Sequence, residues 1–162
     1  MQSKTKKIVL AALLASLTCV ATMIIKVPSP LKGYVNLGDC IVLLCGWVLS
    51  PLYGFLAAGI GSALADIFSG YILYAPATFV IKGLMSLVAF FLARKTKKLP
   101  LLILSGLTAE VVMVAGYYVF EGFLYGFIPS LVNIPANAVQ GIMGLIFGII
   151  LVRIFDKTNI AK

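Results

Sequence analysis

The stretch LGDCIVLLCGWVLSPLYGFLAAGIGSALADIF, residues 37–68, is apolar almost throughout and is too long for one ordinary membrane helix. A helix rises about 1.5 Å per residue, so about 20 residues cross a hydrocarbon core of about 30 Å. The segment SPLYG at 50–54 interrupts the stretch, because Pro51 lacks a backbone N–H and favours a turn. We therefore predict two shorter membrane spans joined at this turn.

Outside this stretch, four apolar runs each have the length of a membrane span: Ile8–Ile25, Ala75–Ala93, Leu99–Phe120 and Ile134–Phe155. The first run follows lysines, as in a signal peptide, but it is long for one and no A-x-A-like cleavage site follows it, so we keep it as a span. Of the 162 residues, 62% are hydrophobic and 11% are charged, which is typical of an integral membrane protein. The sequence predicts an all-α membrane protein, one domain over residues 1–162, with six transmembrane helices.

The 13 Lys and Arg residues against 5 Asp and Glu could indicate nucleic-acid binding, but their placement follows the orientation rule for membrane proteins. With both termini cytoplasmic, six crossings put most basic residues on the cytoplasmic side: Lys4, Lys6, Lys7, Arg94, Lys95, Lys97, Lys98, Arg153, Lys157 and Lys162. Lys26 and Lys32 then lie outside. A re-entrant hairpin in place of the middle two spans would preserve this orientation. We expect a multi-pass cell-membrane protein that binds no nucleic acid.

The sequence lacks the residues and motifs that are typical of an enzyme active site. It contains no histidine, the commonest general base and metal ligand. Cys19, Cys40 and Cys45 lie in or beside apolar runs and lack zinc or redox spacing, so we interpret them as small apolar residues. We expect no catalysis, no metal and no cofactor; a small membrane enzyme that uses buried carboxylates is the alternative.

Polar residues within the spans gather on one side of the membrane. Ionisable groups there are costly and mark either a functional site or a buried pair. The direction of each span puts these groups in the outer half or near the middle: Asp66, Lys82, Glu110, Asn137 and Gln140 within spans, and Asn36, Asp39 and Glu121 near the outer boundary. We therefore predict a pocket open to the outer side and closed below.

Several of these residues also have a purely structural interpretation. Lys82 and Glu110 could form a buried neutralising pair, and Asp39 could cap the second helix. The tyrosines on the outer side, among them Tyr74 and Tyr117, could form an interfacial aromatic belt. The candidate substrate-binding residues are Asn36, Asp39, Asp66, Tyr74, Lys82, Glu110, Tyr117, Asn137 and Gln140.

Small residues on the first span have helix-packing spacing. Ala11 and Ala15 lie four residues apart, and Ala12 and Ser16 repeat the pattern one position on. Such spacing lets another helix approach closely. Tight internal packing is the ordinary explanation of this pattern, and a docking face for another membrane subunit is the alternative.

Two blocks, NLGD at 36–39 and YAPATFVIKG at 74–83, give the chain a specific resemblance. With the size, the six spans and the Ala11-x-x-x-Ala15 motif, they resemble the substrate-binding S component of energy-coupling factor (ECF) vitamin transporters. The chain is most similar to the riboflavin-type group, especially members assigned to hydroxymethylpyrimidine and pyridoxine.

The resemblance implies a role that composition does not. An S component of the prokaryotic plasma membrane captures a vitamin outside, and a transmembrane coupling subunit with two ATPase subunits energises uptake as the S component topples in the bilayer. By this resemblance Ala11 and Ala15 contact the coupling subunit, and residues 26–39 cover the ligand. No Gly-Lys-Ser/Thr phosphate loop occurs in the chain, so a partner must hydrolyse ATP. Pyridoxine or hydroxymethylpyrimidine is the favoured substrate; riboflavin and a stand-alone carrier are alternatives.

Overall fold

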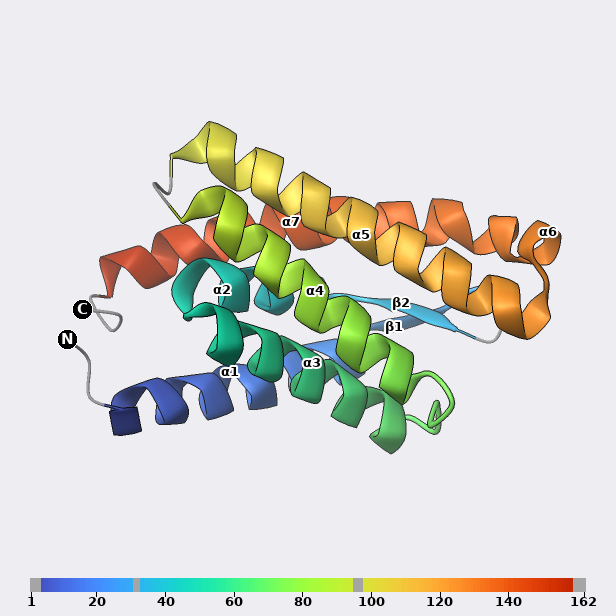
Figure 1. The fold of residues 1–162 in the computed structure, drawn as a ribbon, viewed down its shortest axis with the longest axis horizontal. Coiled ribbons are helices and arrows are strands. Elements are labelled where there is room, and N and C mark those ends of the chain that lie inside the picture. The colour runs from blue at the N-terminus through green and yellow to red at the C-terminus, as the bar shows by residue number, and fades with distance from the viewer. Residues whose placement is uncertain (1–3, 31–32, 95–97, 159–162) are drawn as a thin grey trace.

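A computed structural model describes residues 4–30, 33–94 and 98–158 as a bundle of long helices around one short buried helix (Figure 1). The elements in chain order are α1 (Lys4–Ile24), β1 (Lys26–Pro28), β2 (Tyr34–Asn36), α2 (Asp39–Val48), α3 (Pro51–Phe68), α4 (Ala75–Ala93), α5 (Leu99–Tyr125), α6 (Phe127–Ser130), a 3-10 turn (Leu131–Asn133) and α7 (Ile134–Lys157). The helical fold and the break at Pro51 are confirmed, since α2 ends at Val48 and α3 begins at Pro51. Lys32, Lys95, Lys97 and Lys162 lie outside the described residues.

Helix lengths differ from the predicted spans in two places. Five helical segments of the described chain are long and apolar enough to cross a bilayer, and α5 extends to Tyr125 instead of Phe120. In contrast, α2 has only 10 residues and rises roughly 15 Å, about half of a hydrocarbon core. Strand β2 comes just before α2 in the chain and lies between α2 and the opposite end of the bundle (Figure 1). Its three residues add roughly 10 Å to the length of this crossing. A strand followed by a helix therefore covers most of this crossing.

The short hairpin was not predicted from the sequence. Strands β1 and β2 pair antiparallel, with Lys26 opposite Asn36 and Pro28 opposite Tyr34. Strand β2 is half-buried and packs against α7 and α1, whereas β1 is exposed (Figure 1). The described part of the segment between α1 and α2 therefore lies against the bundle, with β2 toward the helices and β1 on its outer side.

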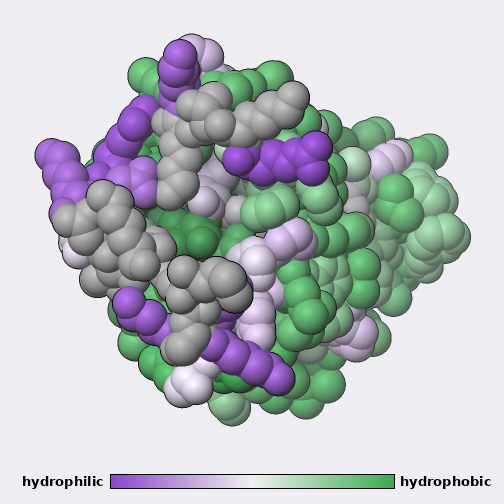
Figure 2. Space-filling view, turned by 60° about the vertical axis from the view of Figure 1, so that its left-hand side comes forward, coloured by the Kyte–Doolittle hydropathy of each residue, from purple (hydrophilic) through white to green (hydrophobic). Residues whose placement is uncertain are grey.

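The basic residues mark one end of the molecule, which we call the basic end. Helix α1 begins there with Lys4, Lys6 and Lys7, and α7 finishes there with Arg153 and Lys157 (left in Figure 1). Figure 2 shows hydrophilic side chains gathered over this end beside an apolar flank. The two ends of the described chain therefore lie on the same side, as an even number of crossings requires. The opposite end, toward which the hairpin extends, is called the far end below.

The core is built around α2. Its residues from Asp39 to Trp47 are all buried, so α2 faces protein on every side. Trp47 donates its indole N–H to Ser105 Oγ on α5 at 3.0 Å, which satisfies the polar atom of this buried ring. Because α2 is enclosed on all sides, its neighbours fix where its first residue, Asp39, lies.

Substitution of Gly46 tests this close packing. A Cβ at Gly46 would lie 2.4 Å from the backbone oxygen of Ser86 on α4, so Gly46→Ala must push the two helices apart. We expect a loss of about 1–3 kcal/mol in the free energy of unfolding, measured by thermal unfolding in detergent. Gly148→Ala is the matched control, since its nearest atoms lie 3.3 Å away and beyond. An equal loss in both variants would contradict the packing described here.

Candidate ligand-binding site

A small polar cavity lies at the far end, between the hairpin and helices α3, α4, α5 and α7. Its lining residues are Ser29, Gly33, Tyr34, Asn36, Asp66, Tyr71, Tyr74, Thr78, Tyr117, Glu121, Asn137 and Gln140. Of the nine predicted substrate-binding residues, six line this cavity: Asn36, Asp66, Tyr74, Tyr117, Asn137 and Gln140. Its volume is about 30 Å³, far below the roughly 300 Å³ at which ligand pockets begin. The walls must move apart to admit a ring-shaped ligand.

One face of α4 supplies the cavity and the polar layer beneath it. Tyr74, Thr78 and Lys82 follow at intervals of four residues and all three are buried, so they form one line along the helix. The hydroxyl groups of Thr78 and Tyr117 are hydrogen-bonded at 3.0 Å, which ties α4 to α5. Thr78 was not among the predicted substrate-binding residues. Its position four residues from both Tyr74 and Lys82 could have identified it, because residues four apart share one face of a helix.

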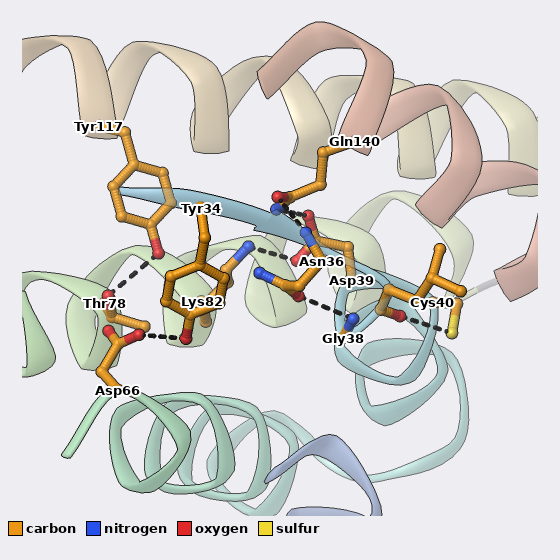
Figure 3. Close-up of polar contacts among 11 residues, drawn as sticks. Tyr34, Asn36, Gly38, Asp39, Cys40, Asp66, Thr78, Lys82, Tyr117 and Gln140 are labelled. Carbon is orange, nitrogen blue, oxygen red and sulfur yellow. Dashed lines mark hydrogen bonds and ion pairs between the residues drawn. The ribbon is translucent and has the colours of Figure 1, made fainter. Parts of the chain in front are cut away.

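The hairpin contacts α3 through an aromatic hydroxyl. Tyr34 Oη donates to Asp66 Oδ1 at 2.6 Å (Figure 3). This hydrogen bond joins β2 to α3. The Tyr34 ring lies 4.8 Å from the ring of Tyr71.

Gln140 on α7 joins the hairpin to the start of α2. Its Oε1 accepts the backbone N–H of Asn36 at 2.9 Å, and its Nε2 donates to Asp39 Oδ2 at 2.6 Å. The other carboxylate oxygen of Asp39 is paired with the ammonium group of Lys82 (Figure 3). These contacts form a continuous buried chain from β2 to α4, immediately below the cavity.

Asp39 lies deeper in the bundle than the sequence indicated. It was expected near the outer boundary, yet it pairs with Lys82, which is two turns into α4. Strand β2 causes this difference, because it covers the part of the crossing nearest the far end, so that α2 begins deeper in the bundle. The capping interpretation holds only in part. Asp39 lies in the first turn of α2, where a carboxylate suits the helix dipole, but the N-cap residue is Gly38 and no side chain makes a cap hydrogen bond.

Glu110 lies apart from the cavity. It lines an apolar groove between α5 and α7, and neither of its carboxyl oxygens has a hydrogen-bond partner among the described residues. Gly144 gives it room, since a Cβ there would be 2.9 Å from Glu110 Oε1 and 2.7 Å from Asp39 Cβ. The predicted alternative of a direct Lys82–Glu110 ion pair is not what the structure shows, because Lys82 binds Asp39.

Glu121 lines the cavity, although the sequence analysis placed it near the outer boundary and did not include it among the nine candidate substrate-binding residues. Asn133 Nδ2 donates to both of its carboxyl oxygens at 2.9 Å, and Tyr74 Oη donates to one of them at 3.4 Å. Its position four residues after Tyr117 on α5 puts both side chains on one face of the helix, and this spacing could have identified Glu121 as a lining residue. The other unpredicted lining residues are Ser29, Gly33 and Tyr71, which lie outside the helices and strands, and Tyr34, which begins β2. The sequence did not reveal the path of these segments.

The predicted docking residues Ala11 and Ala15 face the protein's own interior. Ala11 is 9% exposed and Ala15 is half-buried. A Cβ on Gly61 of α3 would lie 2.3 Å from the Ala15 carbonyl oxygen, so α1 and α3 approach closely there. The small residues Ala12 and Ser16 are exposed instead.

Gln140→Met tests the link between the hairpin and α7. Methionine has a similar size but cannot accept the Asn36 N–H, so we expect this amide to exchange with solvent deuterium roughly two- to tenfold faster. The measurement is hydrogen–deuterium exchange of the hairpin peptide. Val139→Met, on the exposed side of the same helix, is the control and should leave exchange unchanged. Unaltered exchange in Gln140→Met would refute the link.

No metal site accompanies this arrangement in the part of the chain that the structure describes, where no group of three or more Cys, Asp or Glu residues could hold an ion. The site instead combines aromatic walls, hydroxyl and amide groups, and carboxyl groups. Such a site suits reversible binding of a small polar ring.

Comparisons of sequence connect the chain to transport proteins. The family described as "ECF-type riboflavin transporter, S component" matches residues 2–157. A protein of Pyrococcus woesei, described as an uncharacterized protein in gap 3'region, is 35% identical over 80% of this chain and 87% of its own length. The thiamine precursor transporter HmpT of Lactococcus lactis subsp. cremoris (strain MG1363) is 25% identical over 96% of this chain and 90% of its own length.

Solved structures share the fold. The S component of a bacterial ECF transporter superposes with a TM-score of 0.79 at 25% identity, covering 96% of this chain and 98% of that one. The S component for biotin from an ECF-type ABC transporter gives a TM-score of 0.61 at 20% identity over 94% and 95% of the two chains, and shows similarity of fold alone.

Proposed function

Since the chain belongs to the family of ECF-type riboflavin transporter S components, we propose that it captures a small heteroaromatic vitamin or vitamin precursor in the far-end cavity. The protein is integral to the membrane, and its family is one of transport components and not an enzyme class. By the positive-inside rule the basic end faces the cytoplasm, so the cavity faces outward. The observation that carries the proposal is the ring of tyrosines around buried carboxyl, amide and hydroxyl groups at this end.

Pyridoxine and hydroxymethylpyrimidine are the favoured substrates. Each is a single aromatic ring with polar substituents, which matches tyrosine walls and a few placed hydrogen-bonding groups. The Lactococcus lactis relative is named as a thiamine precursor transporter, which supports the pyrimidine. Riboflavin, named in the family's description, is the alternative and would need a much wider opening of the cavity.

The hairpin acts as the cover of the site in this proposal. It supplies four lining residues, Ser29, Gly33, Tyr34 and Asn36, and it is held by the contacts of Tyr34 to Asp66 and of Asn36 to Gln140. Because the closed cavity is too small for a ring, the hairpin must swing away for entry and return over the ligand.

The energising partners are a transmembrane coupling subunit and two ATPase subunits. The exposed strip of α1 around Ala12 and Ser16 is the docking face that we propose, since Ala11 and Ala15 are turned toward α3. Small exposed residues four apart allow a partner helix to approach closely in lipid.

Uptake with and without these partners tests the function. In cells that express the chain with the coupling and ATPase subunits, labelled pyridoxine or hydroxymethylpyrimidine should accumulate against its gradient. With the chain alone, we expect binding to membranes but no accumulation. Accumulation without the partners would instead establish a stand-alone carrier.

A further inference from the structure

A groove on the flank of the bundle, between α5 and α7, is separate from the far-end cavity. Its volume is about 430 Å³, which is within the range of ligand pockets. The small residues Ala115 and Ala138 are exposed in its wall and leave it hollow. Apart from Glu110 and Tyr118, its described lining is aliphatic or glycine. The groove therefore opens toward lipid and suits an apolar body.

Glu110 brings a carboxyl group to the floor of this groove. The residue is 4% exposed, and neither of its carboxyl oxygens has a hydrogen-bond partner among the described residues. Its Oε2 lies against Gly141 of α7, where an added Cβ would be 3.2 Å away. Because no hydrogen bond holds the carboxyl group in place, it can turn toward the groove by a change of rotamer. A buried carboxyl group without a partner is costly in a membrane, so a donor that enters the groove is favoured.

The buried layer around Glu110 has fewer cations than carboxyl groups. Asp39 lies next to Glu110, since a Cβ at Gly144 would be 2.7 Å from Asp39 Cβ and 2.9 Å from Glu110 Oε1. Lys82 is paired with Asp39, and the other oxygen of Asp39 accepts from Gln140. Two carboxyl groups thus share one ammonium group, and a second cation would balance the layer.

The depth of Glu110 limits what can reach it. Helix α5 begins with Leu99 at the basic end, so Glu110 lies roughly 16 Å along the helix, about half of the hydrocarbon core. From there the groove continues toward the far end as far as Tyr118, roughly another 12 Å. The amino group of a phospholipid stays at the membrane surface and does not reach this depth. The ligand must be a molecule that dissolves in the hydrocarbon itself.

We propose that this groove binds a lipid-soluble primary amine, with the amino group on Glu110 and the hydrocarbon body lying between α5 and α7 toward Tyr118. The site is independent of the proposed capture of a vitamin. An alcohol is a poorer ligand, because its hydroxyl group donates a single hydrogen bond and leaves the second carboxyl oxygen unpaired. A protonated amino group has donors for both oxygens and supplies the missing cation.

Labelling with dicyclohexylcarbodiimide tests whether Glu110 is reached from lipid. This apolar reagent adds the carboxyl O–H across one of its C=N bonds, and transfer of the acyl group from oxygen to nitrogen then gives a stable N-acylurea with no leaving group. The protein is labelled in lipid nanodiscs and its peptides are analysed by mass spectrometry. We expect Glu110 to react at least roughly fivefold faster than Glu121, whose carboxyl group is hydrogen-bonded to Asn133 in the polar cavity. Absence of reaction at Glu110 would overturn the inference.

Protection by three probes tests the choice of ligand. Dodecylamine, 1-dodecanol and dodecyltrimethylammonium are added to the nanodiscs at equal content, and the readout is the fraction of Glu110 that remains unmodified, which counts every product. Dodecylamine should slow the reaction roughly tenfold. The other two probes should slow it less than about twofold, because the alcohol has no charge and the trimethylammonium group has no N–H. Equal protection by all three would show that the groove holds any hydrocarbon chain and would overturn the selection of an amine.

A pair of variants tests the route of entry. Ala138→Phe fills the groove and should slow labelling of Glu110 roughly tenfold. Val139→Phe adds the same ring at the next exposed position, outside the described lining, and should leave labelling unchanged. Since both positions are exposed, neither ring disturbs the core. Equal labelling in the two variants would contradict entry through the groove.

Discussion

Replacing Lys82 with methionine is expected to lower the free energy of unfolding by about 3–5 kcal/mol. Lys82 is 2% exposed and Asp39 is fully buried, so the variant leaves a carboxylate without its cation inside the membrane-spanning bundle. The loss should appear as a much lower midpoint of thermal unfolding in detergent, followed by fluorescence of the only tryptophan, Trp47.

The double variant Lys82→Met with Asp39→Asn provides the control. Asparagine keeps an oxygen for Gln140 but carries no charge, so the double variant should recover most of the stability. If Lys82→Met alone were as stable as the unaltered protein, or if the double variant were no better than the single one, the buried pair would not hold α2 to α4.

Replacing both Ala12 and Ser16 with tryptophan is expected to reduce uptake by roughly tenfold or more while leaving the affinity for ligand unchanged. The two residues are exposed on α1 and lie away from the cavity, so bulky side chains there obstruct only a docked helix. Uptake is measured in cells with the coupling and ATPase subunits, and affinity on the isolated protein.

Two further variants isolate the docking effect. Leu104→Trp adds a similar ring on an exposed position of α5 and should leave uptake intact. Ala11→Trp should prevent folding itself, because Ala11 is packed in the core. Normal uptake by the Ala12 and Ser16 double variant would show that the partner docks elsewhere.

Much of the fold follows from simple patterns in the sequence. Apolar runs of membrane length predicted the long helices, and Pro51 predicted the break between α2 and α3. The distribution of lysines predicted that the two ends of the described chain lie on the same side of the molecule. Part of the α4 contribution was also predicted, since Tyr74 lines the cavity and Lys82, on the same face of the helix, lies in the polar layer beneath it. These signals are local, and they depend only on helix periodicity and on the thickness of the bilayer.

The hairpin explains most of what the sequence did not reveal. Residues 26–36 look like an ordinary outer loop, and nothing in their composition shows that Lys26–Pro28 pairs with Tyr34–Asn36 or that the second strand packs against the helices. This packing places Tyr34 in the cavity wall and puts Asp39 at the level of Lys82. Long-range contacts such as Asn36 with Gln140 join residues far apart in the chain, and periodicity carries no information about such pairs.

The identity of the bound compound tests the central claim most directly. The protein is purified from cells grown in rich medium and denatured, and the released small molecules are identified by mass spectrometry. Thr78→Trp, which fills the cavity wall with a large ring, is processed in parallel as the control. We predict release of a heteroaromatic vitamin or precursor, close to one molecule per chain, from the unaltered protein and none from Thr78→Trp. Release of no such compound from the unaltered protein, or equal release from both, would contradict capture of a vitamin in this cavity.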